Sequence, residues 1–68
     1  MDIVVNGLQR SLPRGATVAD LVAEMGHDLA RPGVAVAVNG MVVTRGAWEQ
    51  QTLHDGDRVE VLGAAQGG

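Results

Sequence analysis

Two Asn-Gly dipeptides, each preceded by a run of β-branched or small apolar residues, constrain the fold of this 68-residue chain most strongly. Both central residues of the favoured two-residue hairpin turn need a positive φ, which asparagine and glycine tolerate best. Asn6-Gly7 and Asn39-Gly40 therefore predict two β-hairpins. The strands that they join are predicted at residues 3–5 and 8–12 and at residues 34–38 and 41–43.

The alternation of side chains within these strands predicts which face of the sheet is buried. Successive strand residues point to opposite faces, so the three valines of residues 34–38 face the core while Ala35 and Ala37 face away. This segment is the best candidate for the central strand. Arg10 interrupts the apolar alternation of residues 8–12, and we expect an edge strand or a bulge there.

A helical pattern starts at residue 18. Thr17 is a favourable N-cap residue, and Asp20 completes a capping box three residues later. Apolar side chains then recur at helical spacing, and Gly26 stands where a C-terminal cap belongs. The apolar stripe comprises Val18, Leu21, Val22 and Met25. A helix of about two turns is unstable alone, so it must pack on the sheet.

The rest of the chain supplies one more strand. Polar residues around Trp48 indicate a helical turn, Leu53 is expected in the core, and Asp55-Gly56-Asp57 is typical of a turn. Residues 58–62 alternate as a strand with both valines inward. A right-handed crossover makes one later strand parallel to an earlier one. We expect an α+β, β-grasp (ubiquitin-like) fold, a mixed four- to five-stranded sheet with one main helix on one face.

Composition excludes several classes of function. The chain has no cysteine, which removes disulfides, thiolate nucleophiles and cysteine-ligated metal sites. Trp48 is the single aromatic residue, so the chain lacks a stacking platform for single-stranded nucleic acid. A net charge of −3 also fits a phosphate backbone poorly. With no signal peptide and no bilayer-length apolar run, we expect a cytoplasmic protein without nucleic-acid or membrane partners.

Few side chains are candidates for chemistry. The only histidines are His27 and His54, and so small a core offers little support for a Ser-His-Asp assembly. His54, Asp55 and Asp57 resemble a metal-ligand set, but turn chemistry explains the aspartates, which we expect to bind the amides of their own turn. Trp48 is expected to cap the core. We predict no catalytic residue, no metal site and no bound cofactor.

The last six residues carry no large side chain and end in Gly67-Gly68. Glycine lets the backbone approach reactive groups closely. Residues 63–68 reach about 20 Å when extended, enough to thread a carboxylate into a partner's active site. We therefore divide the chain into a domain at residues 1–62 and a flexible tail at residues 63–68. The expected chemistry is adenylation of the Gly68 carboxylate by a partner enzyme. The predicted threading residues are Gly63, Ala64, Ala65, Gln66 and Gly67.

These residues resemble the ThiS family of sulfur carriers along essentially the whole chain. The resemblance rests on Ile3-Val4-Val5-Asn6-Gly7, Thr17-Val18-Ala19-Asp20-Leu21, Val36-Ala37-Val38-Asn39-Gly40, Val42-Val43, Arg45, Trp48, Asp55-Gly56-Asp57-Arg58-Val59-Glu60-Val61 and Gln66-Gly67-Gly68. It implies a protein co-substrate of other enzymes rather than an enzyme.

In that family, an E1-like adenylyltransferase of the ThiF type uses ATP and Mg²⁺ to adenylate the C-terminal glycine, here Gly68. Sulfur from a cysteine-desulfurase pathway then gives a thiocarboxylate. A thiazole synthase of the ThiG type receives this sulfur to form thiazole phosphate in thiamin biosynthesis. The resemblance implies the same partners for this chain, which itself binds no cofactor.

No motif marks the partner-binding surface. We expect it on the sheet face away from the helix, where small alanines permit close docking, at Val4, Ala35, Ala37 and Leu62. Three alternatives stay open. They are a sulfur carrier of molybdopterin synthase, a ubiquitin-like modifier of lysine amines, and a β-grasp interaction domain with an incidental Gly-Gly end.

Overall fold

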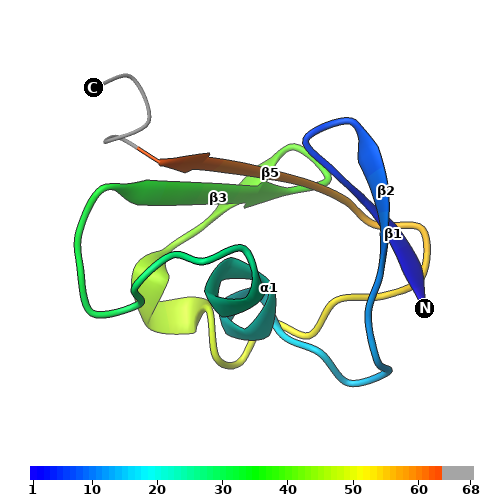
Figure 1. Cartoon of the computed structure of the whole chain (residues 1–68), viewed down its shortest axis with the longest axis horizontal. Coiled ribbons are helices and arrows are strands. Elements are labelled where there is room, and N and C mark those ends of the chain that lie inside the picture. Colours follow the sequence, from blue (N-terminus) through cyan, green and yellow to red (C-terminus); the bar gives the residue numbers. More distant parts are fainter. Residues whose placement is uncertain (64–68) are drawn as a thin grey trace.

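The computed structural model describes residues 1–63, which form five strands, one α-helix and one 3₁₀ helix. These elements are β1 (Asp2–Val5), β2 (Leu8–Ser11), α1 (Val18–Glu24), β3 (Val34–Val38), β4 (Met41–Val43), η1 (Arg45–Ala47) and β5 (Arg58–Gly63). The strands form one mixed sheet in the order β2-β1-β5-β3-β4, and α1 packs on one of its faces (Figure 1). β5 is parallel to β1 and antiparallel to β3. This is the β-grasp arrangement that the sequence predicted.

Both Asn-Gly dipeptides form the predicted hairpin turns. Asn6 and Asn39 have φ angles of 52° and 50°, and the glycines that follow them have φ angles of 83° and 84°. Positive φ at both central residues gives such a turn a twist that matches the strands on either side. The turn sets the register of each hairpin, so that Val5 lies opposite Leu8 in the first one.

Helix α1 begins at the predicted capping box. The Thr17 amide donates a hydrogen bond to Oδ2 of Asp20 (2.9 Å), and the Asp20 amide donates to the Thr17 hydroxyl (3.2 Å). Met25 is the C-cap, and Gly26 follows with a φ of 90°, a conformation that costs glycine little. The predicted apolar stripe is buried over Val18, Leu21 and Val22, while Met25 is half-buried against the core.

The core between the sheet and α1 is made of aliphatic side chains and one indole. Ile3, Leu21 and Leu53 are fully buried, as the sequence predicted for Leu53. Trp48 is only 3% exposed, and its Nε1 donates to the Val43 carbonyl (2.9 Å), so it is a core residue with its one polar atom bonded. Within residues 1–63, no polar or charged side chain is buried, and no helix is long and apolar enough to cross a bilayer.

The position and the end of β5 differ from the sequence interpretation. β5, rather than β3, is the middle strand, because its parallel pairing with β1 places it between the two hairpins. β5 also continues one residue beyond Leu62, since Gly63 pairs with Val34 of β3. Gly63 therefore belongs to the sheet. The boundary was missed because glycine has no side chain to mark it as a strand residue, although β3 supplies a partner for its backbone.

The strand β2 lies at the edge of the sheet, one of the two possibilities that Arg10 indicated. Its pairing with β1 is continuous, so there is no bulge in this strand. Arg10 lies opposite Ile3 on the helix side of the sheet, and its guanidinium forms an ion pair with Glu24 of α1 (2.9 Å). An edge position lets an inward-pointing charge reach solvent and a partner at the same time.

Candidate partner-docking face

The sheet has one face that the helices do not cover. Figure 1 shows α1 and η1 on the same side of the sheet, so the opposite side is formed by strand side chains. We call this the outer face. Since alternate strand residues share a face, the strand pairs that involve β3 and β5 place seven residues on it. They are Val4, Ala35, Ala37, Val42, Arg58, Glu60 and Leu62.

Four apolar side chains from three neighbouring strands form one half of the outer face. Leu62 lies opposite Ala35, and Val42 lies opposite Ala37, in antiparallel pairs whose side chains stand side by side. Leu62 and Val42 are 68% and 78% exposed. We name these four residues the apolar patch. Two large exposed aliphatic side chains beside two alanines make a low apolar surface of the kind that partner proteins cover.

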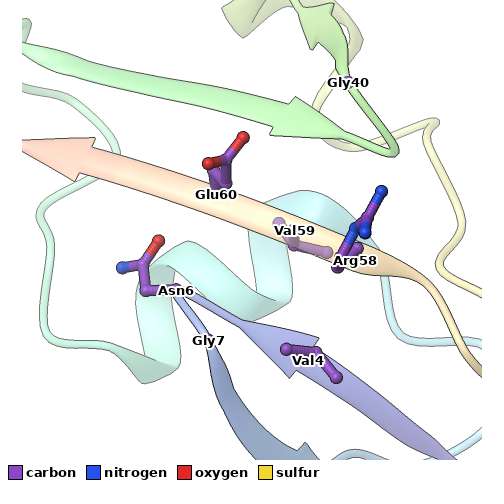
Figure 2. Close-up of a pocket in the computed structure, with 7 residues that line it drawn as sticks. All are labelled: Val4, Asn6, Gly7, Gly40, Arg58, Val59 and Glu60. Atoms are coloured by element: carbon purple, nitrogen blue, oxygen red, sulfur yellow. The ribbon is translucent and has the colours of Figure 1, made fainter.

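The other half of the outer face is a pocket of about 420 Å³ between the two hairpin turns (Figure 2). Arg58 and Glu60 rise from β5 on the outer side, and Val4 of β1 lines the pocket across from them. We call this the polar pocket. One guanidinium and one carboxylate, two residues apart on a single strand, offer a partner both a positive and a negative contact. Charge complementarity of this kind contributes more to the choice and orientation of the partner than to the binding affinity.

The four docking residues predicted from the sequence share the outer face but fall into two groups. Three of them adjoin one another in the apolar patch, whereas Val4 lies beside Arg58 in the polar pocket. Val4 and Leu62 are therefore about 13 Å apart along β5, at 3.3 Å per strand residue. Val42 is a member that the sequence interpretation missed. The two-residue turn before β4 already places Val42 opposite Ala37, so the hairpin register was the available signal.

The predicted tail starts at the edge of the apolar patch. Gly63 lies in β5, where it lines a shallow apolar depression with Ala35 and Leu62. A carboxy-terminal segment that leaves from Gly63 thus starts beside the apolar patch. The remaining predicted tail residues lie outside the described part of the chain. They are Ala64, Ala65, Gln66, Gly67 and Gly68.

The acidic turn before β5 is structural. Asp57 accepts hydrogen bonds from the His54 amide (2.8 Å) and from Nδ2 of Asn39 (3.0 Å), so it stabilises its own turn as predicted. Asp55 instead accepts the Asp2 amide at the start of β1 (2.7 Å), which corrects the expectation that both aspartates bind amides of the turn. Among residues 1–63, no three His, Asp or Glu side chains are grouped as metal ligands would be.

Asn6 and Asn39 have a second role that the sequence interpretation missed. Each reaches from its turn to the backbone of β5, Asn6 at Val61 and Asn39 at Arg58. Turn preferences explain an asparagine by its φ angle and carry no information about a partner 55 residues away, as Val61 is from Asn6. The two asparagines therefore hold β5 along its two edges, Asn6 on the edge next to β1 and Asn39 on the edge next to β3.

The matches to known protein families agree with this architecture. A model of the ThiS family matches residues 3–68. The sulfur carrier protein ThiS of Escherichia coli is 31% identical over 68 residues, and the match covers the whole of both chains. The chain belongs to the ThiS family. The resemblance expected from the sequence is thereby confirmed.

Other ThiS-related proteins extend the comparison. The crystal structure of the thiamine biosynthesis protein ThiS from Geobacter metallireducens matches this ThiS-family chain with a TM-score of 0.79 at 33% identity, over 91% of each chain. This likeness confirms the fold. A thiazole synthase of Paramagnetospirillum magneticum is 34% identical over 68 residues, which is all of this chain but only 20% of that protein. The chain thus spans a fifth of the length of that relative.

Proposed function

We propose that this ThiS-family chain is a sulfur carrier in thiamin biosynthesis. The observation that carries the proposal is the match to the Escherichia coli sulfur carrier, which runs over all 68 residues of this chain and all of that protein. The family model also extends to Gly68, the residue on which the chemistry depends. A carrier of this kind needs a stable domain and an accessible carboxylate, and its catalytic groups come from partner enzymes.

The proposed chemistry takes place at the Gly68 carboxylate. An E1-like adenylyltransferase of the ThiF type binds ATP and Mg²⁺, and a carboxylate oxygen attacks the α-phosphorus of ATP with release of pyrophosphate. A persulfide from a cysteine-desulfurase pathway then displaces AMP to give an acyl disulfide. Attack of a second thiol on the sulfur remote from the acyl group leaves the thiocarboxylate on Gly68 and releases a disulfide. A carboxylate is a poor electrophile, so activation must precede the entry of sulfur. The dependence on ATP is consistent with a cytoplasmic location.

A thiazole synthase of the ThiG type is the proposed acceptor of the sulfur. The support is the thiazole synthase of Paramagnetospirillum magneticum, in which one fifth of the polypeptide resembles this entire chain. A carrier-like segment and a synthase in one polypeptide indicate that the two work together. The thiocarboxylate sulfur attacks the acceptor as a nucleophile, which a carboxylate oxygen does far less readily.

The outer face is the proposed docking surface for these enzymes. The exposed side chains of Leu62 and Val42 supply the apolar contact, and the small side chains of Ala35 and Ala37 permit a close approach. The charges of Arg58 and Glu60 in the polar pocket set the orientation of the partner. Val4 belongs to the same surface. The apolar patch adjoins Gly63, so a partner that covers it also meets the start of residues 64–68. Residues 63–68 reach about 20 Å when extended, which carries Gly68 well inside a docked enzyme.

Intact-mass spectrometry tests the proposed function. The full chain is incubated with ATP, Mg²⁺, a ThiF-type enzyme and a sulfur source, and the expected product is heavier by the difference between a sulfur and an oxygen atom. Collision-induced fragmentation should place the change on Gly68. No mass change with an enzyme that thiocarboxylates its own carrier would overturn the proposal. Sulfur transfer to the large subunit of molybdopterin synthase, and none to a thiazole synthase, would instead assign the chain to the molybdopterin pathway.

A further inference from the structure

The Asn6 side chain takes the place of a strand residue beside β5. Its Nδ2 donates to the Val61 carbonyl (3.0 Å), and its Oδ1 accepts from the Val61 amide (2.9 Å). Both backbone polar groups of Val61 are therefore bonded by one side chain. Figure 2 shows Asn6 just beyond the end of β1, with its side chain directed towards β5.

This contact lies where the backbone pairing of β1 with β5 stops. β1 pairs with β5 at Val4 and Val5, and the Asn6 amide adds one hydrogen bond to the Val59 carbonyl (2.9 Å). The chain then turns away at Gly7, so the Asn6 side chain adds the next step of the ladder, at Val61. On its other side, β5 stays paired with β3 through Gly63.

Val61 is two residues before Gly63, the last described residue of β5. The Asn6 side chain is thus the last β1-side contact to β5 that the described residues contain before the segment 64–68. A strand held on both sides at Val61 has a defined direction at Gly63. A strand held on one side only can twist or separate from the sheet edge more easily, because single ladder hydrogen bonds are weak.

We propose that Asn6 is a positioning residue for the activation of Gly68, acting through Val61 and the direction in which β5 leaves the sheet. The inference rests on the proposed carrier function and goes beyond it, because it assigns a role in threading to a residue of the first hairpin turn. After a partner has bound the outer face, the Gly68 carboxylate must still enter the active site of that partner. Loss of the Asn6 contact lowers the fraction of complexes in which it does so, since productive geometry tolerates little displacement.

Asn39 provides a matched control within the same molecule. It is also the first residue of an Asn-Gly turn, with a φ of 50° against 52° for Asn6. Its Oδ1 accepts the Arg58 amide (2.9 Å) and its Nδ2 donates to Asp57 (3.0 Å), so it holds the opposite end of β5. Glycine tolerates positive φ, so Asn6→Gly and Asn39→Gly each remove a side chain without straining the turn.

The test compares the two variants in adenylation by a ThiF-type enzyme, measured as ATP–pyrophosphate exchange with the full chain as substrate. We expect Asn6→Gly to lower kcat about tenfold while the Kd for the enzyme without ATP changes by less than about threefold, and Asn39→Gly to leave both values near those of the unmodified chain. Amide hydrogen exchange should accelerate at Val61 in Asn6→Gly and at Arg58 in Asn39→Gly. Asn6→Asp keeps the acceptor but places a carboxylate oxygen against the Val61 carbonyl oxygen, so it should also lower kcat.

Three results would overturn the inference. They are an unchanged kcat for Asn6→Gly, an equal loss for both glycine variants, and a loss that appears only in Kd. If Asn6→Gly does not fold at the assay temperature, Asn6→Asp decides, because an unchanged kcat with accelerated exchange at Val61 also contradicts the role. Failure of the unmodified chain to be adenylated would instead contradict the proposed function itself, and the inference would fall with it.

Discussion

The Arg45 guanidinium lies 4.6 Å from the centre of the Trp48 ring, and the same group donates hydrogen bonds to the carbonyls of Leu29 and Arg31. One side chain thus joins the indole that completes the core to the loop that leads from α1 to β3. The family resemblance included both residues by their spacing alone. The structure gives this spacing a physical basis, because only a planar group with several N–H donors can stack on a ring and bond two carbonyls together.

Replacing Arg45 with alanine should destabilise the domain. We expect the free energy of unfolding to fall by about 1–2 kcal/mol, from the lost cation–π contact and the two exposed charge-assisted hydrogen bonds. Urea unfolding followed by far-ultraviolet circular dichroism measures this change. Arg45→Lys is the control, since it keeps the charge but loses the forked geometry, and it should recover less than half of the loss. Full recovery by lysine would show that charge alone matters at this position.

Replacing Thr17 with alanine should weaken helix α1 at its first turn. The substitution removes the hydroxyl that accepts the Asp20 amide, and caps of this kind contribute about 1 kcal/mol. The readout is the Tm of the full chain. For a domain of this size, about 1 kcal/mol corresponds to a shift of roughly 4–8 °C. Thr17→Ser keeps the hydroxyl and should stay close to the original Tm; an equal loss in the serine variant would assign the effect to the methyl group.

A charge placed in the apolar patch should weaken partner binding without unfolding the domain. We expect Leu62→Asp to raise the Kd for the ThiF-type enzyme at least about tenfold, the range expected for a central interface residue. Leu8→Asp is the matched control, since Leu8 is 74% exposed against 68% for Leu62 but lies on the helix side of the sheet. Calorimetric titration gives both affinities. Equal effects at the two positions would move the docking surface away from the outer face.

Removing Gly67-Gly68 should abolish thiocarboxylate formation and leave stability unchanged. Glycine has no side chain to add to a buried apolar cluster, so we expect the free energy of unfolding to change by no more than about 0.5 kcal/mol. Intact-mass analysis with the activating enzyme and equilibrium urea unfolding are run on the same preparation. A large loss of stability in the shortened chain would mean that these glycines are part of the folded structure, contrary to the tail assignment.

Much of the fold follows from local features of the sequence. The Asn-Gly dipeptides at residues 6–7 and 39–40 predicted both hairpins, and the Thr17 capping box predicted the start of α1. The alternation in residues 34–38 predicted which side chains would be buried and which would form the outer face. Each of these features depends on residues that are close together in the sequence, so local geometry is sufficient to predict it.

What the sequence did not predict depends on contacts between distant residues. The Asp55 carboxylate bonds an amide 53 residues away, and the Asn6 side chain bonds a residue 55 positions away. The central place of β5 is likewise decided by its pairing with the first strand of the chain. No local preference distinguishes these partners from others of the same chemistry. Only the assembled sheet selects them.

The burial of Trp48 gives this protein an optical property of its own. Trp48 is the one aromatic residue in the sequence and is 3% exposed, on the side of the sheet opposite the outer face. Its fluorescence therefore reports the packing of a single indole, free of any background from tyrosine or another tryptophan. A partner that covers the outer face should leave this emission almost unchanged, whereas loosening of the core should shift it to longer wavelength. Docking and unfolding can thus be separated in one cuvette, without a label.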